Sequence, residues 1–252
     1  MFLLVFSLST RGKEMSEAAV GVRRSGEPHV PELEPGDRLT RVEFERRYHA
    51  MPDLKKAELI EGIVYMPSPT RFRRHGEPNR HLSAWLGVYQ GATPGIRGAD
   101  NVSVRLDIDN EPQPDGVLLI DPNCGGQVRI TGDDYIEGGP ELVAEVSSSS
   151  VSYDLGDKLQ VFRRHGVREY VVWRVLDREI DWFVSREGRF ETLPLTSNSV
   201  YKSEVFPGLW LDAAAIVQGD LAAVLAVLRE GIDAPEHAEF VERLQRLASE
   251  KT

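Results

Sequence analysis

The stretch from residue 140 to residue 158 constrains the fold of this chain more than any other. Residues 142–146 form a short apolar run with one carboxylate, Glu145, in its interior, and a serine-rich loop follows them. A predicted helix then begins, with Lys158 near its start. A charged side chain is seldom placed inside a buried strand unless another group pairs with it. We therefore expect a buried strand that contributes Glu145 to a polar site.

A second acid stands in a similar place. Asp115 precedes the continuous apolar run of residues 117–120, which is typical of a central strand covered on both faces. If the two strands are neighbours, Asp115 and Glu145 come together. Two carboxylates suffice to bind a hard cation such as Mg²⁺, which keeps several of its waters, and a nearby lysine can counter developing charge. These are the parts needed to hold a metal and a water against a phosphodiester.

Composition sets the boundaries of this interpretation. The chain of 252 residues, 41% hydrophobic and 28% charged, is ordinary for a globular protein. Its single cysteine, Cys124, excludes an intrachain disulfide and suits the cytoplasm. The net charge of −10 counts against nonspecific coating of DNA, whereas a metal or a local basic patch can still attract phosphate. We therefore expect phosphate binding to depend on a local site.

The first residues are expected to lie outside the folded part. Residues 1–8 are apolar but too short for a signal core or a membrane span, so no membrane partner is expected. Residues 11–37 are rich in Gly, Pro, Glu and Arg, without periodicity. We predict that residues 1–30 are disordered, and we leave open whether translation starts at Met1 or at Met15.

The rest of the chain predicts a mixture of helices and strands. The expected helices are a short one from Thr40, then residues 75–90, 155–165, 213–229 and 235–248. The expected strands are a hairpin within residues 56–66, then residues 101–108, 117–120, 142–146, 168–175, 179–185 and 189–192, with a loop over residues 91–98. This order of elements indicates a domain that contains both helices and strands. Residues 212–252 are expected to form a C-terminal helical extension.

Lys158 and His75 each allow a plain interpretation beside the functional one. On an α-helical wheel Lys158 lies at the flank of an apolar stripe, so its stem is expected along the core and its ammonium at the rim. The plain alternative is a surface pair with Asp154, four residues earlier. His75 is six residues before His81, which does not fit a paired histidine metal site, and a histidine near a helix start is more often a surface or capping group.

Taken in order, these segments resemble a known family. The segments are Glu58-Leu-Ile-Glu-Gly-Ile-Val-Tyr-Met-Pro-Ser-Pro, His75, Pro114-Asp115, Glu145-Val-Ser-x-Ser, Asp154-x-x-x-Lys158 and Gly166-Val-Arg-Glu-Tyr-Val-Val-Trp. Over about residues 38–211 they are similar to the bacterial Uma-type restriction endonuclease family, which belongs to the PD-(D/E)XK nuclease superfamily. The ordered set is specific, because six separate motifs occur in the same sequence order.

The resemblance implies an α/β (α+β) fold with a restriction-endonuclease-like mixed central sheet flanked by helices, in a nuclease domain over residues 31–211. It also implies Mg²⁺ or Mn²⁺ as cofactor and DNA as substrate. It implies that Asp115 and Glu145 are the metal-binding and catalytic acids. The superfamily lysine usually stands two residues after the second acid, where this chain has Ser147. The resemblance therefore assigns the catalytic lysine to Lys158. Three further residues carry over as supporting ones, namely Glu58, His75 and Asp154.

We expect a metal-dependent DNA endonuclease. Two alternatives stay open. One is a catalytically weak or inactive nuclease-fold module that binds or regulates, which the displaced lysine and the net charge favour somewhat. The other is an α/β domain in which Asp115 and Glu145 only cap and pair. The C-terminal helices offer a surface for a homodimer, although an amphipathic stripe more often faces the protein's own core, so the oligomeric state stays open.

Overall fold

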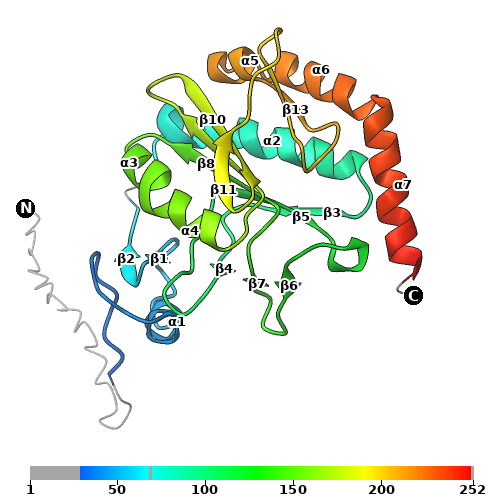
Figure 1. Ribbon diagram of the computed structural model, residues 1–252. Helices are drawn as coiled ribbons and strands as arrows, with labels where there is room; N and C mark the ends of the chain where they lie inside the picture. The colour runs from blue at the N-terminus through cyan, green and yellow to red at the C-terminus, as the bar shows by residue number, and fades with distance from the viewer. Residues whose placement is uncertain (1–28, 68–69, 251–252) are drawn as a thin grey trace, which may run out of the picture. The chain divides into compact units, whose positions relative to one another are not determined.

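The computed structural model describes residues 29–67 and 70–250. Among these residues the main sheet has six strands in the order β11-β10-β9-β8-β5-β3. The central strands β8 (Leu142–Ser147) and β9 (Glu169–Arg174) run parallel, whereas the other neighbours in this sheet are antiparallel. The predicted mixed sheet with flanking helices is therefore confirmed (Figure 1).

The other elements have the following bounds. The main sheet is completed by β3 (Ile96–Ala99), β5 (Gly116–Ile120), β10 (Glu179–Arg186) and β11 (Arg189–Thr192). Smaller sheets pair β1 (Glu58–Ile60) with β2 (Ile63–Tyr65), β12 (Val200–Lys202) with β13 (Trp210–Asp212), and β7 (Ile136–Glu137) with both β4 (Val104–Arg105) and β6 (Arg129–Ile130). The α-helices are α1 (Arg41–His49), α2 (Glu77–Ala92), α3 (Val151–Tyr153), α4 (Leu159–Arg164), α5 (Ala213–Gln218), α6 (Leu221–Ile232) and α7 (Pro235–Glu250). The short turns are the π-helical η1 (Phe72–Gly76) and η3 (Asp154–Lys158) and the 3₁₀ turn η2 (Pro122–Cys124).

Side chains of the central strands alternate between two hydrophobic cores. Leu142 and Ala144 of β8 join one core, which also contains residues of α2, α5, α6 and α7. Val143 joins the other core, which contains Phe162 of α4. Figure 1 shows α4 on one side of the sheet and α2 on the other. Because successive side chains in a strand point to opposite faces, Glu145 shares the face of Val143, toward α4.

The same alternation places the second acid. In β5, Val117 and Leu119 join the core beside α4, whereas Leu118 joins the core beside α2. Asp115, two residues before Val117, therefore lies on the α4 side as well. Two acids that are 30 residues apart in sequence thus face the same helical segment.

Several predicted elements differ from the observed ones. Only Val104 and Arg105 of the predicted strand 101–108 are in a strand, because flanking residues bond within loops, as Leu106 N–H does to the Asn110 carbonyl. Strand β3 instead lies partly within the predicted loop, where it pairs with β5 at the sheet edge. Strand pairing therefore overrode the alternating pattern.

Two predicted helices also have different bounds. The helix predicted over residues 213–229 is broken, because Gly219 has a left-handed φ of 78° and Asp220 caps α6 through the Ala223 N–H. The helix predicted from residue 155 starts at Val151 and contains the π-helical turn η3. The predicted hairpin, the strands β5 and β8, and the final helix are confirmed.

Residues 1–28, which include both candidate start sites and most of the predicted disordered extension, lie outside the described residues. Residues from Pro31 onward form one unit, and the site described below lies within it. None of the helices in the described part of the chain has the length and apolar character required to cross a membrane.

Candidate active site

Asp115, directly before β5, and Glu145 of β8 lie close together. Their strands are neighbours, with Gly116 opposite Ala144 in the antiparallel pair. The Asp115 N–H lies 3.4 Å from Glu145 Oε2, and the Val146 N–H donates to Asp115 Oδ2 at 2.9 Å. The two acids are only 2% and 4% exposed. Pairing of the strands therefore buries two carboxylates within one polar cluster.

Lys158 is the cation at the centre of this cluster. Its Nζ donates to Glu145 Oε1 at 2.5 Å and lies 2.9 Å from Glu58 Oε1 and 3.8 Å from Asp154 Oδ1. Lys158 is 1% exposed. The expected position at the rim was therefore wrong, and so was the plain alternative of a surface pair with Asp154. The wheel assumed regular α-helical geometry, whereas this segment is a π-helical turn, and the three acids offset the cost of burying the ammonium.

A second lysine, which the sequence analysis did not single out, holds Asp115. Lys56 Nζ lies 3.0 Å from Asp115 Oδ1, and His75 Nε2 lies 3.0 Å from Asp115 Oδ2. The signal that could have indicated Lys56 is its place two residues before Glu58, at the entrance to an otherwise apolar hairpin. His75, expected as a surface or capping group in the plain interpretation, touches the candidate acid directly.

The cluster contains more acid than base. Four carboxylates are buried together, and two ammonium groups lie among them, with His75 at one edge. Glu58 also accepts the Gln113 N–H at 2.8 Å. Buried charge without an opposite charge is costly. The arrangement is therefore suited to take up a further cation or a proton.

Burial and neighbouring charges shift the pKa values of these groups in opposite directions. Burial alone would raise the pKa of Asp115, but the His75 hydrogen bond and the Lys56 charge lower it well below its usual range. Burial raises the pKa of Glu145, with Lys158 opposing the shift. Burial alone would lower the pKa of Lys158, but the charges of Glu145, Glu58 and Asp154 raise it well above its usual value. Lys158 therefore stays protonated, whereas burial favours the protonated form of Glu145.

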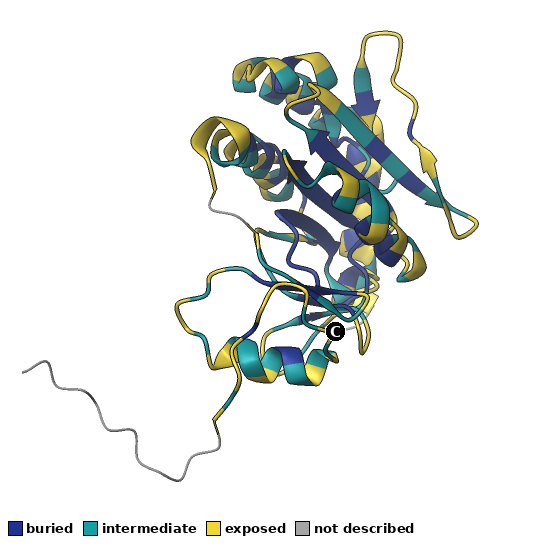
Figure 2. Ribbon diagram, turned by 90° about the vertical axis from the view of Figure 1, so that its left-hand side faces the viewer, coloured by how far each residue is buried: buried dark blue, intermediate teal, exposed yellow. Residues whose placement is uncertain are grey.

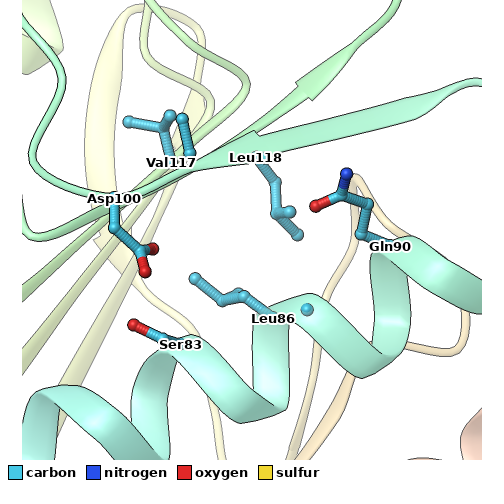
Figure 3. Close-up of a pocket in the computed structure, with 9 residues that line it drawn as sticks. Ser83, Leu86, Gln90, Asp100, Val117 and Leu118 are labelled. Atoms are coloured by element: carbon cyan, nitrogen blue, oxygen red, sulfur yellow. The ribbon is translucent and has the colours of Figure 1, made fainter.

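A small cavity on the α2 side of the sheet does not contain this cluster. It has a volume of about 160 Å³ and lies between α2 and the strands β3 and β5. Figure 3 shows Ser83 and Gln90 on the helix side, with Asp100 on the sheet side. None of the predicted site residues lines it. The candidate site is thus a packed polar cluster at the strand ends rather than this cavity.

The donor set is suited to a hard divalent cation. Asp115 and Glu145 offer carboxylate oxygens, which Mg²⁺ and Mn²⁺ prefer, and the excess of acid gives such a cation an electrostatic reason to bind. Among the described residues no group of three or more His, Cys, Asp or Glu is already arranged around a metal position. Lys56 instead places an ammonium on Asp115, and its side chain is 22% exposed.

The structure thus has a mixed sheet with two neighbouring acids and a lysine at one site. The resemblance to restriction-endonuclease-like proteins implied this arrangement. The model of the Uma2 family, described as "Putative restriction endonuclease", matches residues 42–214. The chain belongs to this family, as the motifs predicted.

Further comparisons add little beyond the family. No curated protein matches the chain. Among solved structures, a crystal structure of "a putative nuclease belonging to DUF820" from Anabaena variabilis is similar, with 12% sequence identity and a TM-score of 0.47. The alignment covers 68% of this chain and 97% of that one.

Proposed function

We propose that this protein is a cytoplasmic endonuclease that hydrolyses phosphodiester bonds in DNA and depends on Mg²⁺ or Mn²⁺. The observation that carries this proposal is the buried cluster in which four carboxylates surround two lysines on one face of the sheet. Membership of a family described as restriction endonucleases supports the reaction class.

Each residue of the cluster has a distinct role in this proposal. Asp115 and Glu145 are the residues that would hold the metal. When bound, a metal of this kind stabilises charge on the phosphate and lowers the pKa of a bound water. His75 fixes the orientation of the Asp115 carboxylate through its hydrogen bond. Glu58 and Asp154 support the cluster through Lys158.

Lys158 acts as a charge rather than as a base. Its pKa is raised well above the usual lysine value because three acids outweigh its burial. A general base needs a pKa near the working pH, so the protonated ammonium is suited instead to orient Glu145 and to counter negative charge during the reaction.

The test is cleavage of supercoiled plasmid over a titration of Mg²⁺ and of Mn²⁺. Asp115→Asn and Glu145→Gln keep the side-chain shape and remove the charge, so we expect each to lower nicking at least about 100-fold. Asp100→Asn is the matched control, because Asp100 is exposed and forms no ion pair or side-chain hydrogen bond with the acid cluster in the described part of the chain. Wild-type nicking rates in both site variants would refute the assignment.

One observation favours a second candidate, a module that binds DNA without cutting it. Lys56 and Lys158 already satisfy part of the charge of the acids, so less negative charge is left to attract a metal. Metal binding and DNA binding without nicking, measured by calorimetry and by the plasmid assay, would support this candidate over the enzyme.

A further inference from the structure

The segment Arg71–Arg74 is a basic and aromatic surface beside the candidate active site. All four of its residues are exposed, and Phe72 is 72% exposed. None of its three arginines forms an ion pair or side-chain hydrogen bond with another residue in the described part of the chain. Other arginines do, as Arg105 pairs with Glu45 and Asp133. In a chain with a net charge of −10, these three guanidinium groups are therefore free to bind an anion.

This segment is tied to the acid cluster through the backbone. The Arg71 carbonyl accepts the N–H groups of His75, at 3.0 Å, and of Gly76, at 3.1 Å. His75 in turn bonds to Asp115. Arg71–Arg74 thus lies within one helical turn of a residue that touches the candidate metal ligand. Figure 2 shows this exposed turn directly after the short grey stretch at residues 68–69.

The side chains of the segment match the two chemical features of a nucleic-acid strand. Guanidinium groups bind phosphate oxygens in a bidentate manner. Phe72 is the one aromatic residue among the large hydrophobic side chains that are exposed in the described part of the chain. Surfaces that combine arginines with an exposed aromatic ring bind single strands, because a base stacks on the ring while the cations follow the backbone. In a continuous duplex the base faces are already stacked on one another, and opening a step costs energy.

We propose that Arg71, Arg73 and Arg74 bind phosphates next to the cleaved one and that Phe72 stacks on an unpaired base. The preferred substrate is then DNA with an unpaired base beside the cleavage position, such as a single strand, a flap or a gap, rather than continuous duplex. This inference rests on the proposed nuclease function for the position of the cleaved phosphate, while the binding surface itself is tested separately.

The test is binding of the full-length protein to short labelled oligonucleotides in EDTA, so that no cutting occurs. Fluorescence anisotropy compares single-stranded, gapped and continuous duplex DNA. We expect wild type to bind single-stranded and gapped DNA more tightly than continuous duplex. Phe72→Ala should weaken binding to the first two about tenfold and change duplex binding less than about twofold. A 2-aminopurine at the unpaired position should be quenched by wild type and not by Phe72→Ala.

The arginines are tested with a matched triple variant. Replacing Arg71, Arg73 and Arg74 by alanine should weaken binding to all three DNA substrates. It should also reduce the salt dependence of binding, because fewer counterions are released. The control removes an equal charge from exposed arginines on α6 and α7, namely Arg229, Arg243 and Arg246. This control should bind as wild type does.

The outcomes separate this inference from the proposed function. If Phe72→Ala and the Arg71 triple variant both bind like wild type, or if wild type prefers continuous duplex, the inference is wrong even where the protein cuts DNA. If wild type binds single strands through Phe72 but never cuts, the binding surface holds and the proposed hydrolysis fails.

Discussion

Lys56 illustrates how one residue can control the proposed metal site. Its ammonium lies 3.0 Å from Asp115, and the charges of Glu145, Asp115 and Glu58 outweigh burial and raise its pKa. In the proposed metal site, a divalent cation on Asp115 would meet this ammonium at the same carboxylate. We therefore expect the lysine and the metal to compete for Asp115.

We therefore predict that Lys56→Met raises the affinity for Mn²⁺ roughly tenfold, since methionine fills the space without the charge. Isothermal titration calorimetry measures the affinity. Lys55→Met, which changes the same charge on an exposed neighbour, is the control and should bind as wild type. Equal affinities in all three proteins would show that Lys56 does not compete with metal.

Glu111 gives a second prediction at this scale, outside the site. It is 1% exposed, and burial, followed by a hydrogen bond with Glu45, raises its pKa to about 8. The folded protein thus keeps a proton that the unfolded chain releases near pH 4.5. The unfolding free energy contributed by this group is therefore fully present below that pH and is lost as the pH rises toward 8.

Glu111→Gln should flatten the pH dependence of the unfolding free energy. For one proton this slope is at most about 1.4 kcal/mol per pH unit. Urea unfolding over the same pH range measures it. Glu239→Gln, an exposed position on α7, should retain the wild-type slope. A wild-type slope in Glu111→Gln would mean that Glu111 is ionised when folded.

At the scale of elements, both side chains that approach the acids from helical segments come from π-helical turns. His75 belongs to η1 and Lys158 to η3. A π-turn inserts an extra residue into the helical repeat and redirects the side chains around it, and such turns are frequent at functional sites. The strands hold Asp115 and Glu145 in fixed register, while the two π-turns bring their partners.

Helix α6 makes a close contact that a single methyl group should disrupt. A Cβ on Gly231 would lie 2.3 Å from the Gly208 carbonyl oxygen and 2.7 Å from the Trp210 ring. We predict that Gly231→Ala lowers the unfolding free energy by about 1–3 kcal/mol. Gly87 in α2 has nothing within 4 Å of its Cβ position, so Gly87→Ala should gain about 0.5–1 kcal/mol from helix propensity. Guanidinium unfolding compares the two, and equal effects would contradict the steric explanation.

At the scale of the whole folded unit, the C-terminal helix belongs to a core that includes the sheet. Phe240 and Leu244 of α7 are buried in the same cluster as Leu142 of β8. We predict that a chain ending at Ala234 loses about 3–6 kcal/mol of unfolding free energy, since each of the two side chains contributes about 1.5–3 kcal/mol. Phe240→Ala combined with Leu244→Ala should cause most of this loss while keeping the helix. Unchanged urea unfolding after truncation would show that α7 stabilises nothing.

The sequence by itself determined the local part of this protein. Apolar runs of strand length marked β5 and β8, with Asp115 directly before one run and Glu145 inside the other, because the apolar pattern of a strand is a local property. Six motifs in order were enough to identify the family.

Tertiary structure alone decided which groups surround those acids. Whether Lys158 lies at the rim or is buried depends on whether acids from other elements compensate its desolvation, and Glu58 is 100 residues away in the sequence. The same holds for Lys56, which meets Asp115 only after Leu59 of the hairpin pairs with Glu111. The edge strand β3 likewise depends on pairing with β5 and not on its own pattern. Period and composition are local, whereas burial, charge compensation and strand pairing depend on partners distant in the chain.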